Sequence, residues 1–244
     1  MHLRHIQIQN HQINRSHGHP LDGFETAAGL LTRLPDPLPP PAVVMMPVLM
    51  GGPEARPPAV PRSPGSGRPA AVLVLLYPDG DGDARVVLIE RTTGDGHHSG
   101  EVSFPGGKSE PGDGHPAATA LREASEEVGL DPVVAGVRVV GQLDRMWIPV
   151  SDFDVTPVLA LAERAPSLAA SPFEVARIIE APVARFLPGA PVTMVERTIR
   201  DWPLRYGSYE LDGLSVWGAT ARILSQLGAI LAPVAEPAPP ADRP

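Results

Sequence analysis

The chain has 244 residues, a formal net charge of −8 and no cysteine. This length allows one core of moderate size with appendages, or at most two small domains. The acidic balance argues against a nucleic-acid partner, because phosphate backbones bind basic surfaces. The lack of cysteine excludes disulfides, thiolate nucleophiles and cysteine-ligated zinc. No apolar run reaches the roughly 18 residues of a membrane span, and no secretory signal pattern begins the chain, so we expect a soluble cytoplasmic protein without a membrane partner.

The two ends and the region before residue 68 have the composition of unstructured segments. Residues 1–20 hold five of the eight histidines and predict a disordered extension. Residues 21–67 predict a short helix followed by a Pro-rich linker, and residues 232–244 a Pro-rich disordered tail, since proline lacks a backbone donor. Helical spacing of Phe24 and Leu31 favours a helix that docks on the domain or on a partner subunit, so a homodimer remains open.

Residues 68–231 mix strand and helix patterns and predict one folded domain. Strand-like runs "AAVLVLLYP" and "ARVVLIER" flank the hairpin turn "DGDGD". A helix from about His115 to Val128 follows, and then strands in "VRVVGQLDRMWI" and "DVTPVLALA". "SPFEVARII" predicts a further helix capped by Ser171, and "VTMVERTIR" and "LRYGSYEL" predict strands before a terminal helix in "SVWGATARILSQLGAIL". This irregular order indicates an α+β fold with a mixed β-sheet flanked by helices.

The predicted helix after the glycine loop ends in an unusual cluster of acids. Successive residues turn by about 100°, so Glu123 and Glu127 share one face with Glu126 beside them. Gly129 is the expected helix stop. Carboxylates near the negative end of a helix dipole are unfavourable without a cation, and Arg122 is a single positive charge. Oxygen ligands converging on Mg²⁺ or Mn²⁺ therefore explain the cluster better than a solvated surface does.

The stretch "GGKSEPGDGHPAATALREASEEVGL" resembles the Nudix box, G-x5-E-x7-R-E-U-x-E-E-x-G-U, where U is aliphatic or similar. The residues that match its second half are Arg122, Glu123, Ala124, Glu126, Glu127, Gly129 and Leu130. The first half departs from the pattern. Asp113 stands in the place of the early glutamate, and eight residues, not seven, separate it from Arg122. A one-residue insertion of this kind occurs in the coenzyme A pyrophosphatase branch of the family.

The sequence before the box resembles the same branch. "VLIERTTGDGHHSGEVSFPGG" keeps the residues of the branch motif at Leu88, Arg91, Gly100, Phe104, Pro105, Gly106 and Gly107. Thr92 stands at a small-residue position, and Gly96 stands where the motif has a second arginine. The resemblance covers about residues 68–231 and implies a Nudix-type α/β/α sandwich. It also implies metal-dependent hydrolysis of coenzyme A or acyl-coenzyme A, with ADP-ribose hydrolysis or nucleotide binding without catalysis as alternatives.

The resemblance further implies the roles of individual residues. The metal ligands would be Glu123, Glu126, Glu127 and a backbone carbonyl of Gly106 or Gly107. Arg122 would orient the carboxylates. Glu126 and Glu127 are catalytic candidates, together with Glu174, which could be a remote base, a further ligand or a helix N-terminal acid. The substrate-binding candidates are Arg91, which could instead pair with a local acid, His98, which could instead be solvated, Glu101 and Gly106. We expect Trp202, Tyr206 and Trp217 to serve packing.

Overall fold

The computed structural model of the chain describes residues 6–7, 23–51, 67–93, 100–199 and 202–232. Its helices are α1 (Phe24–Leu31), α2 (Pro116–Val128) and α3 (Gly218–Leu231), with short 3-10 helices η1 (Val43–Met45) and η2 (Val183–Phe186). Within the described residues, no helix is long and apolar enough to cross a bilayer.

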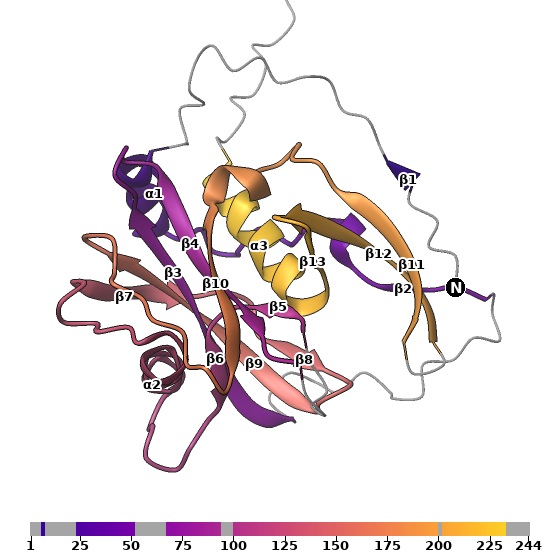
Figure 1. The fold of residues 1–244 in the computed structure, drawn as a ribbon. Coiled ribbons are helices and arrows are strands. Elements are labelled where there is room, and N and C mark those ends of the chain that lie inside the picture. The colour runs from indigo at the N-terminus through magenta and orange to yellow at the C-terminus, as the bar shows by residue number, and fades with distance from the viewer. Residues whose placement is uncertain (1–5, 8–22, 52–66, 94–99, 200–201, 233–244) are drawn as a thin grey trace, which may run out of the picture.

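The main sheet is mixed, as the sequence predicts (Figure 1). Its strands are β3 (Arg68–Pro78), β4 (Ala84–Arg91), β5 (Val102–Ser103), β6 (Gly106–Lys108), β7 (Val137–Gln142), β8 (Met146–Ile148), β9 (Phe153–Ala162) and β10 (Val175–Pro182). The central order is β10-β4-β3-β9-β7, with β5 on β4, β6 on β3 and β8 on β9. Only β3 and β9 pair in parallel among the described strands. Because β4 pairs with one end of β3 and β6 with the other, the glycine-rich turn lies against the middle of the sheet.

Helices cover both faces of this sheet (Figure 1). Alternate residues of β3 point to opposite sides, as expected for a strand. Leu73 and Leu75 pack with Ala124 of α2, whereas Val74 and Leu76 pack with α1 and α3. Three layers result, with α2 alone on one side. The α+β class with a mixed sheet flanked by helices is therefore confirmed.

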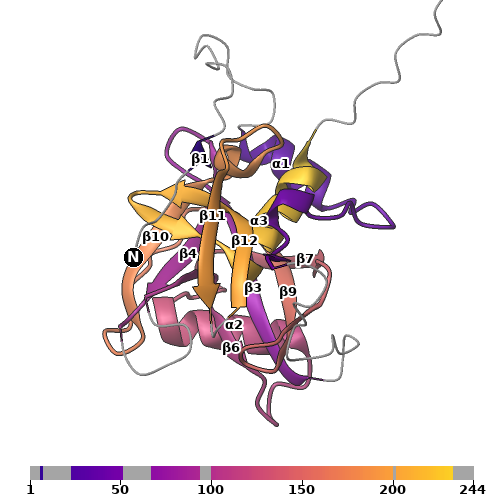
Figure 2. The ribbon, with the colours of Figure 1, turned by 90° about the vertical axis from the view of Figure 1, so that its right-hand side faces the viewer.

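A second, smaller sheet lies beside the main one (Figure 2). It consists of β1 (Ile6–Gln7), β2 (Val48–Leu49), β11 (Thr193–Ile199), β12 (Trp202–Leu211) and β13 (Leu214–Val216). The hairpin of β11 and β12 forms most of it, with Val195 opposite Tyr206. Both strands were expected, and β13 then leads directly into α3.

The predicted helix in "SPFEVARII" is wrong. Backbone amides of Glu174 and Val175 donate to the Ser171 carbonyl, which makes a single turn, and the chain then enters β10. β10 pairs with β4 and buries Val175 and Ile179. Pairing at the sheet edge and burial of alternate apolar residues outweigh the helix-start signal of the Ser-Pro pair.

The segment before residue 52 is packed more closely than the linker expected there. Helix α1 buries Phe24 and Leu31 against the domain itself, which decides between the two docking surfaces left open by the sequence. Beyond it, the Pro39 carbonyl accepts from Gln226 of α3 at 3.0 Å, and β2 pairs with β12. Prolines lack donors, but their carbonyls still accept hydrogen bonds, so a Pro-rich segment can follow a folded surface.

Met45 of η1 offers a test of this packing. Its side chain is fully buried in the core beside α3. We expect Met45→Ala to lower the free energy of unfolding by about 2–5 kcal/mol, the range for truncating a buried large side chain. Chemical denaturation would measure it. Met46→Ala is the matched control, because Met46 is 38% exposed and should change stability by less than about 0.5 kcal/mol. Equal, negligible effects would show that η1 does not contribute to the core.

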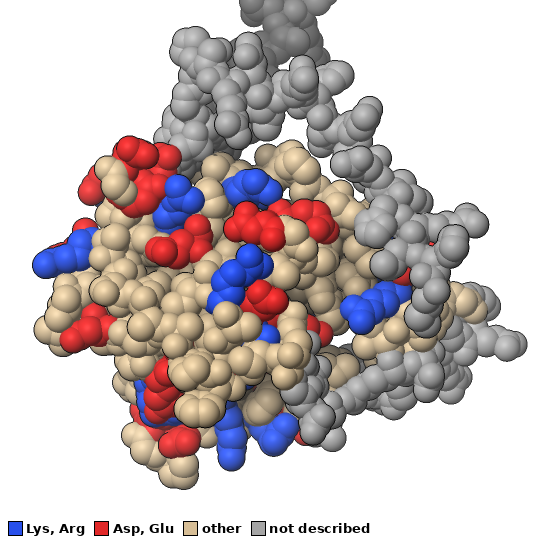
Figure 3. Space-filling view, viewed as in Figure 1, with Lys and Arg blue, Asp and Glu red and all other residues tan. Residues whose placement is uncertain are grey.

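The remaining predictions for the two ends stay predictions. Residues 1–5, 8–22, 52–66 and 233–244 lie outside the described residues, which covers most of the predicted extension, part of the linker and nearly all of the tail. Within the first 20 residues, only Ile6 and Gln7 are described, and their backbones pair with β11. The face in Figure 3 carries interspersed acidic and basic side chains without a continuous basic stripe, in keeping with the net charge.

Candidate active site

The second half of α2 brings three carboxylates toward the glycine-rich turn at β6. Glu127 is 2% exposed, Glu123 is partly buried and Glu126 is exposed. The helix begins at Pro116 after the His115 cap and ends at Gly129, which has a left-handed φ of 65°. These boundaries match the sequence prediction. They place Glu123 and Glu127 one turn apart on the face that meets the sheet.

Glu127 is the most buried of the acids and is held on both oxygens. Oε2 accepts from the Gly106 N–H at 2.8 Å, and Oε1 pairs with the Arg91 guanidinium at 3.2 Å. Burial raises the pKa of Glu127 to about 7, against the lowering effects of Gly106 and Arg91; Glu123 and Glu174 add repulsion. The site therefore holds this carboxyl group where its negative charge lacks full compensation.

Two glycines allow this close approach of backbone and carboxylates. Gly106 has a φ of 154°, and a Cβ there would lie 2.4 Å from the Ala71 carbonyl oxygen. A Cβ on Gly107 would lie 2.6 Å from the carboxyl group of Glu123. A side chain at position 106 would collide with the backbone of β3, whereas one at position 107 would displace the Glu123 carboxyl group. Position 106 thus requires glycine for steric reasons.

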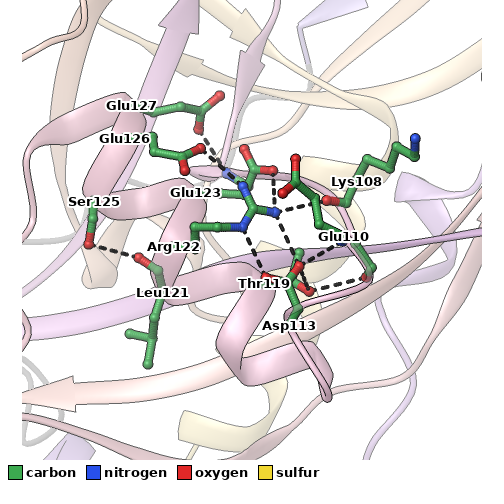
Figure 4. Close-up of polar contacts among 12 residues, drawn as sticks. Lys108, Glu110, Asp113, Thr119, Leu121, Arg122, Glu123, Ser125, Glu126 and Glu127 are labelled. Carbon is green, nitrogen blue, oxygen red and sulfur yellow. Dashed lines mark hydrogen bonds and ion pairs between the residues drawn. The ribbon is translucent and has the colours of Figure 1, made fainter.

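Arg122 ties the acidic helix to the loop that precedes it (Figure 4). Its Nε and Nη2 donate to the Asp113 carboxylate at 3.0 and 3.1 Å, and Nη2 also donates to the Lys108 carbonyl at 3.0 Å. Nη1 donates to Glu126 at 3.0 Å, and Nη2 lies 3.0 Å from Glu123. A guanidinium can serve several acceptors at once because its five donors are fixed in one plane.

The Asp113 carboxylate, which pairs with Arg122, is held by several hydrogen bonds. Besides the bonds from Arg122, it accepts from the Glu110 amide and the Thr119 hydroxyl, both at 2.8 Å. The pKa of Asp113 lies well below its usual range, mainly because Arg122 donates to its carboxylate and to a smaller extent because the Glu110 amide does. The acid that replaces the early glutamate of the box therefore holds Arg122 in place.

Comparison with known proteins gives the family. A NUDIX domain model matches residues 67–166. The chain is 36% identical over 171 residues to the chloroplastic Nudix hydrolase 22 of Arabidopsis thaliana, covering 66% of this chain and 55% of the relative, so it spans just over half that relative's length. It is 34% identical over 173 residues to NudL, an uncharacterized Nudix hydrolase of Photorhabdus laumondii, covering 70% of this chain and 89% of the relative.

The chain belongs to the Nudix hydrolase family. Among solved structures, the Nudix hydrolase RenU of M. smegmatis is similar over 65% of this chain and 81% of that chain, with 20% identity and a TM-score of 0.43. In this Nudix protein, the matched segment contains the whole of the box, including the Asp113 variant. Although the loop is one residue longer than in the box, Asp113 still forms an ion pair with Arg122.

The other candidate residues approach the Nudix site from neighbouring strands. Arg91, at the end of β4, pairs with Glu127, which is the local-acid alternative considered from sequence. The Arg91 N–H also donates to the Glu101 carbonyl at 3.0 Å, so Glu101 lies next to it. Glu174 is in the turn before β10 and not at a helix start, yet its charge raises the pKa of Glu123 and Glu127. His98 lies outside the described residues.

The donor set fits a hard divalent cation. Within the described part of the chain, no three Asp, Glu or His side chains form a ready-made metal site, and the three glutamates of α2 each face an arginine. Burial raises the pKa of Glu123 as well as that of Glu127, and both groups repel Glu174. Carboxylate oxygens are among the ligands that Mg²⁺ and Mn²⁺ prefer, and the carboxylates of α2 share only two arginines among the described residues.

Proposed function

We propose that this protein is a metal-dependent hydrolase that splits the diphosphate bond of coenzyme A or acyl-coenzyme A. The products would be 3′,5′-ADP and 4′-phosphopantetheine or its acyl derivative. The observation that carries the proposal is the buried Glu127 carboxylate, held against Gly106 amid further acids. Buried carboxylates in proteins generally pair with a cation or bind a metal, and Glu127 has Arg91 as a partner but is repelled by Glu123 and Glu174, so it remains an incompletely neutralised buried acid. A site built around one is suited to a cation and a phosphate-bearing substrate.

The acids of α2 would hold Mg²⁺ or Mn²⁺. Glu123, Glu126 and Glu127 would be the side-chain ligands and the Gly107 carbonyl a further oxygen donor. Bound there, the metal would polarise the phosphoryl oxygens and lower the pKa of a water molecule. Arg122 would keep the carboxylates oriented, as partners of metal ligands commonly do. Its contacts with Glu123 and Glu126 support this role.

The chemical step would be attack of water on one phosphorus of the diphosphate. The bridging P–O bond breaks, the leaving phosphate takes the electron pair, and the water proton passes to a carboxylate. Glu126, Glu127 and Glu174 are the candidate bases. Arg91, His98, Glu101 and Gly106 would contact the substrate. For Arg91 the support is position: its side chain is 35% exposed while it reaches Glu127, so it can also face a bound phosphate.

The coenzyme A assignment rests on the upstream motif and the insertion at Asp113. Purified protein with Mg²⁺ should be given coenzyme A, ADP-ribose and a dinucleotide in parallel, and the products should be resolved by chromatography. We expect coenzyme A to be cleaved with the highest kcat/KM. A preference for ADP-ribose would overturn the coenzyme A assignment but would still agree with metal-dependent diphosphate hydrolysis. Tight nucleotide binding without any turnover would instead support a binding protein.

A finer prediction concerns the 3′-phosphate of coenzyme A. We expect coenzyme A to be preferred over 3′-dephospho-coenzyme A by about tenfold in kcat/KM, or roughly 1.4 kcal/mol. The preference should be modest because Gly96 stands at a motif arginine and the net charge of −8 offers little long-range attraction. Steady-state kinetics with both substrates at one ionic strength would measure it. Equal kcat/KM values would mean that the 3′-phosphate is not recognised.

A further inference from the structure

The β11–β12 hairpin lies outside the segment that matches the family model, which ends at residue 166. Directly opposed residues of an antiparallel pair point to the same face, as do residues two apart on one strand. Val195 opposes Tyr206, and Arg197 opposes Leu204. Arg197 and Tyr206 therefore share one face of the hairpin. Arg205, opposite Glu196, points to the other.

This face is connected to the end of the main sheet through aromatic and polar contacts. Tyr206 is 2% exposed and stacks on Trp217, with ring centroids 5.0 Å apart and an interplanar angle of 25°. The exposed Arg197 shares this face with Tyr206. Burial raises the pKa of Tyr206, the charge of Arg197 lowers it and the charge of Glu101 raises it further. Arg197 is therefore a cation next to the aromatic pair.

Glu101 and Val102 connect the aromatic pair with the acidic site. The Glu101 carbonyl accepts from the Arg91 N–H at 3.0 Å, and Arg91 pairs with Glu127. The next residue, Val102, accepts from the Thr220 hydroxyl at 3.0 Å, which fixes the start of α3 and hence Trp217 against β5. These contacts connect Glu127 through Arg91 with Glu101 and Val102, and Val102 through the start of α3 with Trp217, which stacks on Tyr206 of the hairpin.

We propose that Arg197, supported by Tyr206 and Trp217, binds a phosphate group of the substrate that lies outside the scissile diphosphate. This inference rests on the proposed hydrolase function and names the 3′-phosphate of a coenzyme A-type nucleotide as its ligand. Arg91 is less suited to this task because it is engaged with the buried Glu127. Arg197 is exposed, and it takes part in none of the ion pairs among the described residues.

The chemistry favours an arginine here. A guanidinium presents paired donors that match phosphate oxygens. The chain is acidic overall, so a phosphate can be attracted only by a local cation.

The test compares Arg197→Ala with Arg205→Ala. Arg205 is on the same hairpin but on the opposite face, where it lies 3.9 Å from Glu196. We expect Arg197→Ala to reduce the kcat/KM ratio of coenzyme A to 3′-dephospho-coenzyme A from about ten to near one. Arg205→Ala should leave that ratio unchanged. Arg197→Lys should restore part of it, because a lysine keeps the charge without the fork of donors.

A binding measurement separates this inference from the hydrolase proposal. Calorimetric titration of the wild type and both variants with 3′,5′-ADP and with 5′-AMP needs no turnover. Arg197→Ala should weaken binding of 3′,5′-ADP about tenfold more than binding of 5′-AMP. An equal loss for both nucleotides, or none, would overturn the role of Arg197 even if hydrolysis is found. If Arg197→Ala selectively weakens binding of 3′,5′-ADP but the wild type hydrolyses neither coenzyme A substrate, the phosphate site is supported and the hydrolase function is rejected.

Discussion

Replacing Glu127 by glutamine should lower kcat by about 10²-fold or more, the scale of losing one preorganised electrostatic group in an active site. Glutamine has nearly the shape of glutamate, and its carbonyl can still accept from the Gly106 N–H. The change therefore removes the charge and keeps the packing. Folding should survive, because burial and the neighbouring Glu123 and Glu174 already disfavour the ionised carboxylate.

Steady-state kinetics with varied Mg²⁺, together with a Mn²⁺ titration followed by electron paramagnetic resonance, would measure the effect of Glu127→Gln. Weaker metal binding should accompany the slower turnover. Glu163→Gln is the matched control, because it removes the same charge from a side chain that is 77% exposed in the loop after β9. Near-wild-type turnover of Glu127→Gln with an unchanged Mg²⁺ requirement would refute its role at the metal.

Arg122→Ala should reduce activity or metal affinity by about 10–100-fold, the usual cost of removing a group that orients metal ligands. The guanidinium joins Asp113, Lys108 and the two glutamates at positions 123 and 126. Without it, the loop from residue 108 to 113 loses its tie to α2, and the acids lose their only shared cation among the described residues. We expect the metal concentration for half-maximal activity to rise more than KM for the substrate.

Two further variants would show whether geometry or charge matters at Arg122. Arg122→Lys keeps the charge but cannot donate to all four acceptors, so it should recover only part of the activity. Asp113→Asn should cause a similar, smaller loss, because it weakens the charge-assisted bonds that orient the guanidinium. Full activity in Arg122→Lys would mean that positive charge alone suffices. Unchanged metal dependence in Arg122→Ala would contradict the positioning role.

Local pattern alone was enough to predict several elements correctly. The limits of α2 follow from Pro116 at its start and Gly129 at its end, because proline fixes its own φ and glycine tolerates the left-handed conformation that ends a helix. The hairpin between β3 and β4 follows from a turn of alternating Asp and Gly for the same reason. The spacing of Glu123 and Glu127 on one helical face is also a purely local property, so the acidic cluster was visible before any fold was known.

Other features depend on contacts between distant segments. The sequence "SPFEVARII" carries a helix-start signal, yet β10 forms because the edge of β4 is available to pair. Prolines before residue 52 suggest a linker, yet Met45 is buried because α3 and β12 supply an apolar surface. The raised pKa of Glu127, the ion pair of Asp113 with Arg122 and the stacking of Tyr206 on Trp217 arise in the same way. Burial and charge coupling are set by neighbours in space, and spacing along one chain segment does not encode them.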